Sequence, residues 1–197
     1  MRATGTSSPR RSSRPRDNAI ALGAVDLGET PRSWSAILAP MSLAESPEVE
    51  VLAADAGRWR ATIEVWPERG AAGQMSEGTL VCRMCGPWLV SDFKNETSGF
   101  EGHGISGWDS VHGRYVSTWV DPLRRGLVVM QGRWDEQART MSFVGEMTRP
   151  DGSRMRWREV TERPEDDVRV FRSFVPSPEG GDFEVMTVRY KRHKSPA

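Results

Sequence analysis

The chain has 197 residues, 37% of them hydrophobic and 27% charged, which is typical of one globular domain that buries a core without disulfide or metal support. It carries 27 Lys and Arg against 27 Asp and Glu, so a zero net charge gives no general attraction to nucleic acid or to an anionic membrane, and we expect neither as a partner. Two cysteines exclude a disulfide framework, and no apolar run approaches the ~18 residues that span a bilayer, so we expect a cytoplasmic protein.

The first 40 residues are rich in Ser, Arg, Pro and Thr, and we predict that residues 1–40 form a disordered tail and lead-in. Several arginines precede the first acid, Asp17, as they would in a basic arm for nucleic acid or acidic lipid. No aromatic residue lies between those arginines to stack on bases, so we interpret the segment as a solvated tail. The folded domain is expected at residues 41–193.

A short helix is expected from about Ser46 to Ala54. Pro47 suits its first turn, and Gly57 is placed to end it. Its apolar side would carry Val49, Val51 and Leu52.

From Trp59 onward the apolar residues recur every second position, which predicts about ten β-strands. The connectors are short and rich in turn residues, so neighbouring strands should be antiparallel, and a meander of this many strands closes on itself. We therefore predict a single antiparallel up-and-down β-barrel, an all-β fold. The strand segments are WRATIEVW, GTLVCRMC, WLVSDFKN, EGHGISGW, GRYVSTWV, GLVVMQGRW, RTMSFVGEM, SRMRWREVT, DVRVFRSFV and DFEVMTVRY.

Alternation also predicts which side chains face the lumen. In SRMRWREVT, Met155, Trp157, Glu159 and Thr161 share one face, and Arg154, Arg156 and Arg158 share the other. The first face is expected inside and the second in water.

One hairpin can be given a register. A four-residue loop in WDEQAR would pair Trp134 with Arg139, Met141 with Gly132 and Phe143 with Met130. This register places Trp134, Met130, Met141 and Phe143 on the same side of the sheet.

The stretch FEGHGISGWDSVHGRYVSTWVD is dense in glycine. Gly102 and Gly104 lie inside a strand, where glycine indicates a bulge, a bend or the close approach of a ring from the next strand. Asp109 to Gly113 is expected to form the turn, with Gly113 supplying a positive φ. A phosphate-binding loop needs a helix start and typically a lysine, and neither is present.

These segments together resemble a bacterial family, the domain of unknown function 1579. The residues that carry the resemblance are GRW from Gly57, WLVSDFKNE, FEGHGISGWD, YVSTWVD, VVMQGRWDEQARTMSFVGE, WREVTE, DVRVFRSF and MTVRY. The resemblance implies a lipocalin-like, calycin-type β-barrel and no established activity. Members usually have glycine where this chain has Ser117, and the pair Cys82 and Cys85 is not part of the pattern. GRW is also similar to the Gly-x-Trp signature of lipocalins and nitrobindin-like haem barrels, which implies that Trp59 plugs the barrel floor.

A lumen lined by large apolar rings and a few polar groups favours the binding of a small, mostly apolar ligand. The candidate ligand-binding residues are His103, Trp119, Asp121, Met130, Trp134, Phe143, Trp157 and Glu159.

Two other functions remain open. The first is a barrel-fold enzyme, such as an isomerase, cyclase or hydrolase, that uses His103 with Glu159 or Asp121. The second is a haem barrel, which needs an axial histidine facing the lumen, and only His103 and His112 are placed for that role.

Carboxylates inside an apolar barrel need compensation. Besides Glu159, we expect Asp121 and Glu146 to face inward. Such a group should have a raised pKa or pair with an arginine such as Arg189.

Cys82 and Cys85 form a CxxC pair whose spacing puts them on opposite faces of a strand. With His103 and His112 they could make a Cys₂His₂ zinc set, but a single CxxC is a weak signal. We therefore assign neither a metal nor a cofactor.

Overall fold

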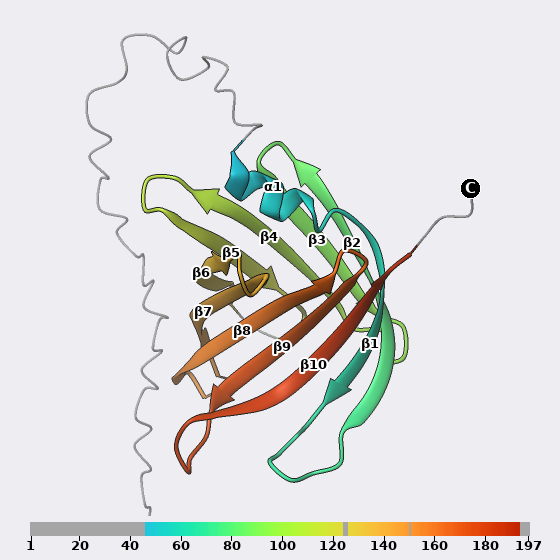
Figure 1. The fold of residues 1–197 in the computed structure, drawn as a ribbon. Helices are drawn as coiled ribbons and strands as arrows, with labels where there is room; N and C mark the ends of the chain where they lie inside the picture. The colour runs from blue at the N-terminus through green and yellow to red at the C-terminus, as the bar shows by residue number, and fades with distance from the viewer. Residues whose placement is uncertain (1–45, 124–125, 150, 194–197) are drawn as a thin grey trace, which may run out of the picture. The chain divides into compact units, whose positions relative to one another are not determined.

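A computed structural model describes residues 46–123, 126–149 and 151–193 of the chain. Within these ranges one short helix precedes ten strands (Figure 1). The elements are α1 (Pro47–Ala53), β1 (Gly57–Val65), β2 (Gln74–Cys85), β3 (Trp88–Asn95), β4 (Glu101–Asp109), β5 (Arg114–Val120), β6 (Val128–Asp135), β7 (Thr140–Thr148), β8 (Arg154–Glu165), β9 (Val168–Pro176) and β10 (Asp182–Arg192). The predicted disordered tail falls outside the described residues.

The helix forms where the sequence places it. The Ser46 hydroxyl accepts a hydrogen bond from the Val49 amide and so caps the first turn, and Pro47 occupies the first helical position. Val49 and Leu52 are buried. No helix in the described part of the chain is long and apolar enough to cross a membrane.

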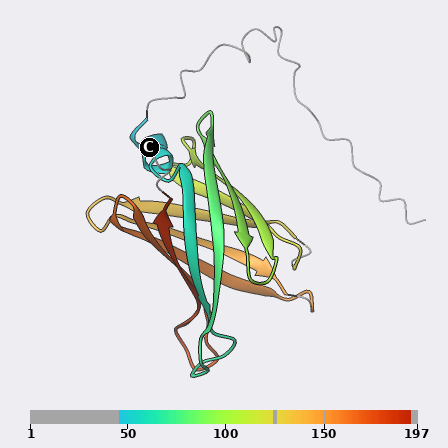
Figure 2. The ribbon, with the colours of Figure 1, turned by 90° about the vertical axis from the view of Figure 1, so that its right-hand side faces the viewer.

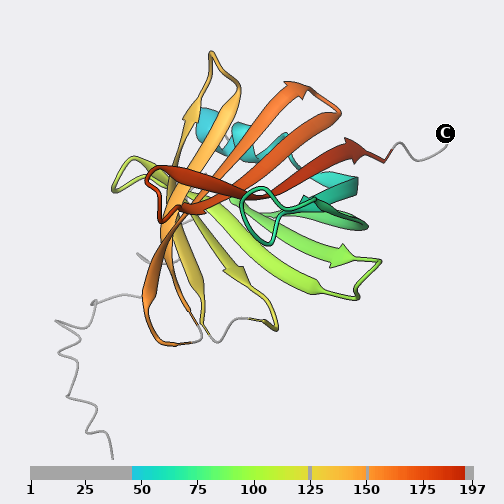
Figure 3. The same ribbon diagram turned by 90° about the horizontal axis from the view of Figure 1, so that it is seen from below.

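The strands form one closed antiparallel barrel. Each strand pairs with the next along the chain, and β1 pairs with β10 to close the wall. Figures 2 and 3 show this wall from the side and from below. The all-β, up-and-down barrel of about ten strands is confirmed, because alternating strands joined by short connectors have no other way to pair every edge.

The helix lies at one end of the barrel, beside β3 and β4 (Figure 1). Two strands that lie apart in the wall are tied to it. Tyr115 of β5 donates its hydroxyl hydrogen bond to the Glu48 carbonyl, and Arg163 of β8 donates to the Val51 carbonyl. The helix therefore spans this end, which we call the helix end; the other is the far end.

The face predicted for β8 is confirmed. Trp157 is buried and Met155 packs against the core, whereas Arg154 and Arg156 are exposed. The strand continues beyond the predicted segment to Glu165, which adds Arg163 to the inner face.

The register predicted for the β6–β7 hairpin is wrong, although its faces are right. Trp134 pairs with Met141 and Gly132 with Phe143, so the four-residue loop begins after Asp135. The Asp135 carboxylate accepts a hydrogen bond from the Ala138 amide, and Arg139 takes a φ of 50°. The turn thereby closes one residue later on each strand, a shift that leaves every side chain on its face.

The glycines of β4 make room for a tryptophan. A methyl group added at Gly102 would collide with the Trp119 ring, and one at Gly104 would press on the same ring. The prediction of close approach by a ring from the next strand is confirmed. Gly113 has a φ of 60°, which confirms its place in the turn.

This packing predicts the effect of a single methyl group. We expect Gly102→Ala to lower the free energy of unfolding by ~1–3 kcal/mol, because the ring of Trp119 must move. Urea denaturation of the two proteins measures the difference. Gly126→Ala is the control, since no residue that the structure describes lies within 4 Å of the added methyl group. If Gly102→Ala is as stable as the control, or if Trp119→Leu does not relieve its effect, the ring does not limit this position.

Candidate functional site

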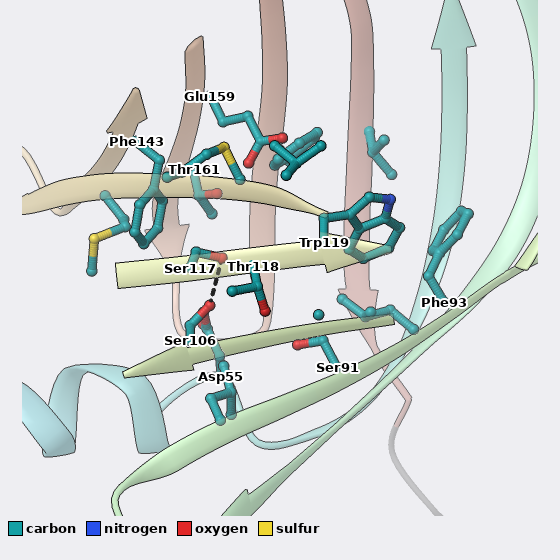
Figure 4. Close-up of a pocket in the computed structure, with 18 of the residues that line it drawn as sticks. Asp55, Ser91, Phe93, Ser106, Ser117, Thr118, Trp119, Phe143, Glu159 and Thr161 are labelled. Atoms are coloured by element: carbon teal, nitrogen blue, oxygen red, sulfur yellow. Dashed lines mark hydrogen bonds between the residues drawn. The ribbon is translucent and has the colours of Figure 1, made fainter. Parts of the chain in front are cut away.

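A cavity of about 300 Å³ occupies the inside of the barrel (Figure 4). It extends from Leu52 of α1 at the helix end to residues near the connectors of the far end. Most of its wall is apolar, with side chains from nine strands, β2 to β10. Central lining residues are Leu80, Leu89, Met130, Met141, Phe143 and Val188.

Aromatic side chains lie toward the far end. Phe93 and Trp119 sit near one another on the same side of the cavity (Figure 4). Phe100 and Leu123 come from connectors beyond β3 and β5. Leu123 lines the cavity and yet is 79% exposed, so the cavity reaches the surface at this end.

Three serines add hydroxyl groups to the wall formed by β3, β4 and β5. Ser106 donates a hydrogen bond of 2.9 Å to Ser117 (Figure 4), and Ser91 lies on the neighbouring strand. The Ser91 hydroxyl is 3.4 Å from the Cys82 sulfur. These groups can hydrogen-bond to a ligand without carrying charge.

The helix end of the cavity is charged. Asp55, Arg163 and Arg169 all line it, and each is at least nine-tenths buried. Arg163 Nη2 and Arg169 Nη1 both donate to Asp55 Oδ2, at 2.9 Å each. We call these three residues the charged cluster.

Aromatic rings surround the charged cluster. The guanidinium carbon of Arg169 lies 4.4 Å from the centre of the Trp59 ring and 4.9 Å from that of Tyr190. Arg163 lies 4.6 Å above the Trp134 ring. Such stacking gives a buried cation partial compensation that water no longer supplies.

Burial and nearby charges determine the charge states of Arg169, Cys82 and Tyr190. Burial alone would lower the pKa of Arg169, but the Asp55 carboxylate, together with the Cys82 and Tyr190 side chains, outweighs this effect and holds it above its ordinary value. Burial raises the pKa of Cys82, with the Arg169 charge acting the opposite way, and burial also raises the pKa of Tyr190. At neutral pH the thiol and the phenol are therefore neutral and Arg169 is charged.

Five of the predicted ligand-binding residues line the cavity: Trp119, Met130, Phe143, Trp157 and Glu159. Trp157 donates its indole hydrogen bond to the Glu159 carboxylate at 2.7 Å. Their role in binding stays a prediction, but alternation has brought them to one space.

His103 does not line the cavity. Its ring lies on the outer face of β4, with a side chain 59% exposed and its Nδ1 2.8 Å from Asp92. His112 lies in the β4–β5 turn, against the Asp109 carboxylate. Neither histidine can reach a ligand in the lumen, and the wall separates His103 from Glu159. The structure therefore corrects the expectation of a lumen-facing histidine, on which the haem and His103–Glu159 alternatives depended.

The other expected inward groups lie elsewhere. Asp121 is half-buried just after the end of β5 and accepts a hydrogen bond from the Trp119 indole. Trp134 packs at the helix end, outside the cavity lining, and donates to Glu136. Glu146 and Arg189 are exposed on the outer face, and Glu146 pairs with Arg154. The expectations for Glu146 and Arg189 were wrong, because each lies on the outward parity of its strand. Asp121 is not among the residues that line the cavity, and its role stays a prediction.

The charged cluster was missed by sequence reasoning. The signal existed for the arginines: Arg163 continues the parity of Trp157 and Glu159, and Arg169 shares that of Phe171. Charged side chains usually face water. Reading the alternation alone therefore places an arginine in a connector or on the outer face of a strand, and not in the lumen. Asp55 follows a helix and has no strand parity to locate it.

Cys82 is buried and Cys85 is exposed, which confirms that they occupy opposite faces. In the ranges that the structure describes, no group of three or more His, Cys, Asp or Glu side chains could hold a metal ion.

Comparison with known proteins gives a family and a fold. The family described as "Protein of unknown function (DUF1579)" matches residues 44–192, in agreement with the resemblance seen in the sequence. No curated protein matches the sequence. Among solved structures, Rv2717c from M. tuberculosis is similar with a TM-score of 0.55 and 12% identity, over 76% of this chain and 99% of that one. A redesigned β-barrel aligns with a TM-score of 0.33 and 15% identity, over 77% and 99%. At these identities the likeness to Rv2717c concerns the fold alone.

The charged cluster predicts a large loss of stability when its one acid is removed. We expect Asp55→Ala to lower the free energy of unfolding by ~3–5 kcal/mol, because two buried guanidinium groups lose their shared partner. Urea denaturation measures it. Asp166→Ala is the control, since that carboxylate pairs with Arg139 while 94% exposed, and its denaturation midpoint should not move. Equal midpoints for the two variants would contradict the importance of the buried contacts.

The two cysteines should react at different rates. We expect a thiol reagent at pH 8 to modify Cys85 rapidly and Cys82 slowly, because burial both shields Cys82 and raises its pKa. Reaction of the folded protein with Ellman's reagent shows the two phases. Cys85→Ser should remove the fast phase, and unfolding should make both thiols fast. Two fast thiols in the folded protein would contradict the burial of Cys82.

Proposed function

The chain belongs to the DUF1579 family, whose description assigns no activity, and we propose from its cavity that the protein binds a small, mostly apolar ligand inside the barrel. The observation that carries this proposal is the internal cavity of about 300 Å³, which lies at the lower end of the size range of ligand pockets. A barrel whose side chains filled its interior would leave no such space.

The composition of the wall supports the same proposal. Leucine, methionine and aromatic side chains supply most of the contact surface, and a few hydroxyl groups such as Ser106 and Ser117 stand among them. Apolar walls bind by removing ligand surface from water, and isolated polar groups fix orientation. The exposed Leu123 marks where a ligand would enter at the far end.

Binding should be visible in the fluorescence of the protein itself. Trp119 and Trp157 line the cavity, so a bound ligand changes their surroundings. We expect at least one of decan-1-ol, retinol and a naphthalene probe to change the tryptophan emission saturably. Native mass spectrometry of gently purified protein checks the stoichiometry, expected to be one ligand per chain.

A cavity-filling variant tests the location. Ser117→Phe puts a ring into the cavity and should weaken binding ~10-fold or more, since the ring takes the space of the ligand. Ser142→Phe is the matched control, because Ser142 alternates with the inward Met141 and Phe143 and so lies on the outer face. Binding unaffected by Ser117→Phe would place the ligand elsewhere, and no response to any probe would contradict the proposal itself.

A further inference from the structure

The charged cluster contains buried polar atoms that nothing in the described protein satisfies. Asp55 Oδ1, Arg163 Nε and Arg169 Nε are buried and make no hydrogen bond. The Arg163 and Arg169 side chains are only 8% and 7% exposed, and both line the cavity. In native proteins buried polar atoms nearly always have a partner, so the cluster is built to meet a further polar group.

Positive charge is in excess among the groups that meet in the cluster. The two guanidinium groups share a single carboxylate oxygen, Asp55 Oδ2. Their other contacts are the Val51 carbonyl, the neutral Cys82 thiol and aromatic rings. One acid neutralises one of two cations, and a remaining buried cation attracts an anion strongly where water is excluded.

The rest of the cavity limits where an anion can lie. Glu159 also lines the cavity, four residues before Arg163 on the same face of β8. At a rise of ~3.3 Å per residue this places it ~13 Å along the strand from the cluster. A negative group is therefore favoured at the helix end and disfavoured midway, and the apolar wall continues toward Phe93 and Trp119.

We infer that the ligand of this cavity is an amphipathic monocarboxylate, held with its carboxylate against Arg163 and Arg169 and its apolar chain directed toward Trp119 and the far end. This inference rests on the proposed function and names the class of ligand. A cavity of about 300 Å³ has room for about ten groups the size of a water molecule, which fits a medium-length chain. Guanidinium groups are suited to a carboxylate because their N–H donors match its geometry. Asp55 binds both arginines and so keeps their side chains oriented toward the carboxylate of the ligand.

The decisive experiment compares head groups on one chain. Decanoate, decan-1-ol and decylammonium, each below its micelle concentration, are titrated into the full-length protein at pH 7.5 by calorimetry and tryptophan fluorescence. We expect decanoate to bind at least ~10-fold more tightly than the alcohol, because charge-assisted hydrogen bonds are the stronger kind. Decylammonium should bind most weakly, since it meets like charge.

Two variants locate the effect. Arg163→Gln should remove most of the preference for decanoate over decan-1-ol, whereas Arg156→Gln, on the outer face of the same strand, should leave it unchanged. An undiminished preference in Arg163→Gln overturns the assignment of the head group. If Arg163→Gln does not fold, the comparison of head groups on the natural protein decides.

The outcomes separate this inference from the proposed function. If decan-1-ol binds as tightly as decanoate or more tightly, the inference of a carboxylate head group is wrong, but the cavity remains a site for an apolar ligand. The same holds if decylammonium binds most tightly, through Asp55 Oδ1. If none of the three binds, and retinol and the naphthalene probe also fail, the proposed function falls as well.

Discussion

The packing of Trp59 holds the helix end of the barrel together. Its ring is fully buried, and its indole donates to the Asp55 carbonyl. The Arg169 and Arg192 guanidinium groups both stack on it, and Arg192 also donates to the Ala54 and Ala56 carbonyls. One side chain thus joins the end of α1 to β1, β9 and β10, at the seam where the barrel closes. The Gly-x-Trp resemblance implied this plugging role, and the structure supplies the contacts that perform it.

The same packing sets the character of the cavity. Because the Arg169 guanidinium group stacks on the Trp59 and Tyr190 rings, its charge is held inside the barrel and does not reach water. Asp55 then has to be buried with it, and Arg163 joins the same carboxylate oxygen. The result is a mostly apolar cavity with the charged cluster at its helix end. The ligand preference proposed above and the stability of the helix end would therefore depend on the same side chains.

Much of the fold could be predicted from the sequence because strand alternation and short connectors leave few topologies. Alternation does not change when the pairing partner of each residue moves by two positions. The faces of β6 and β7 were therefore predicted correctly although the register was not. It also placed Met130, Phe143 and Trp157 correctly in the lumen. It failed for His103, because two inner positions of β4, Gly102 and Gly104, are glycines that receive the Trp119 ring and give no hydrophobic signal in the sequence. It failed for Arg163 and Arg169 because their burial depends on partners from α1 and β1.

Closure of the barrel by β1 and β10 affects how the protein is made. Nine of the ten strands can pair as they leave the ribosome, each with its predecessor, but the last hydrogen-bonded ladder has to wait for the C-terminal strand. Until then β1 presents an open edge, and Trp59 lacks the two arginines that stack on it. Nascent chains are consequently most exposed to aggregation before β10 is made, and a truncation that removes β10 removes the seam that closes the barrel.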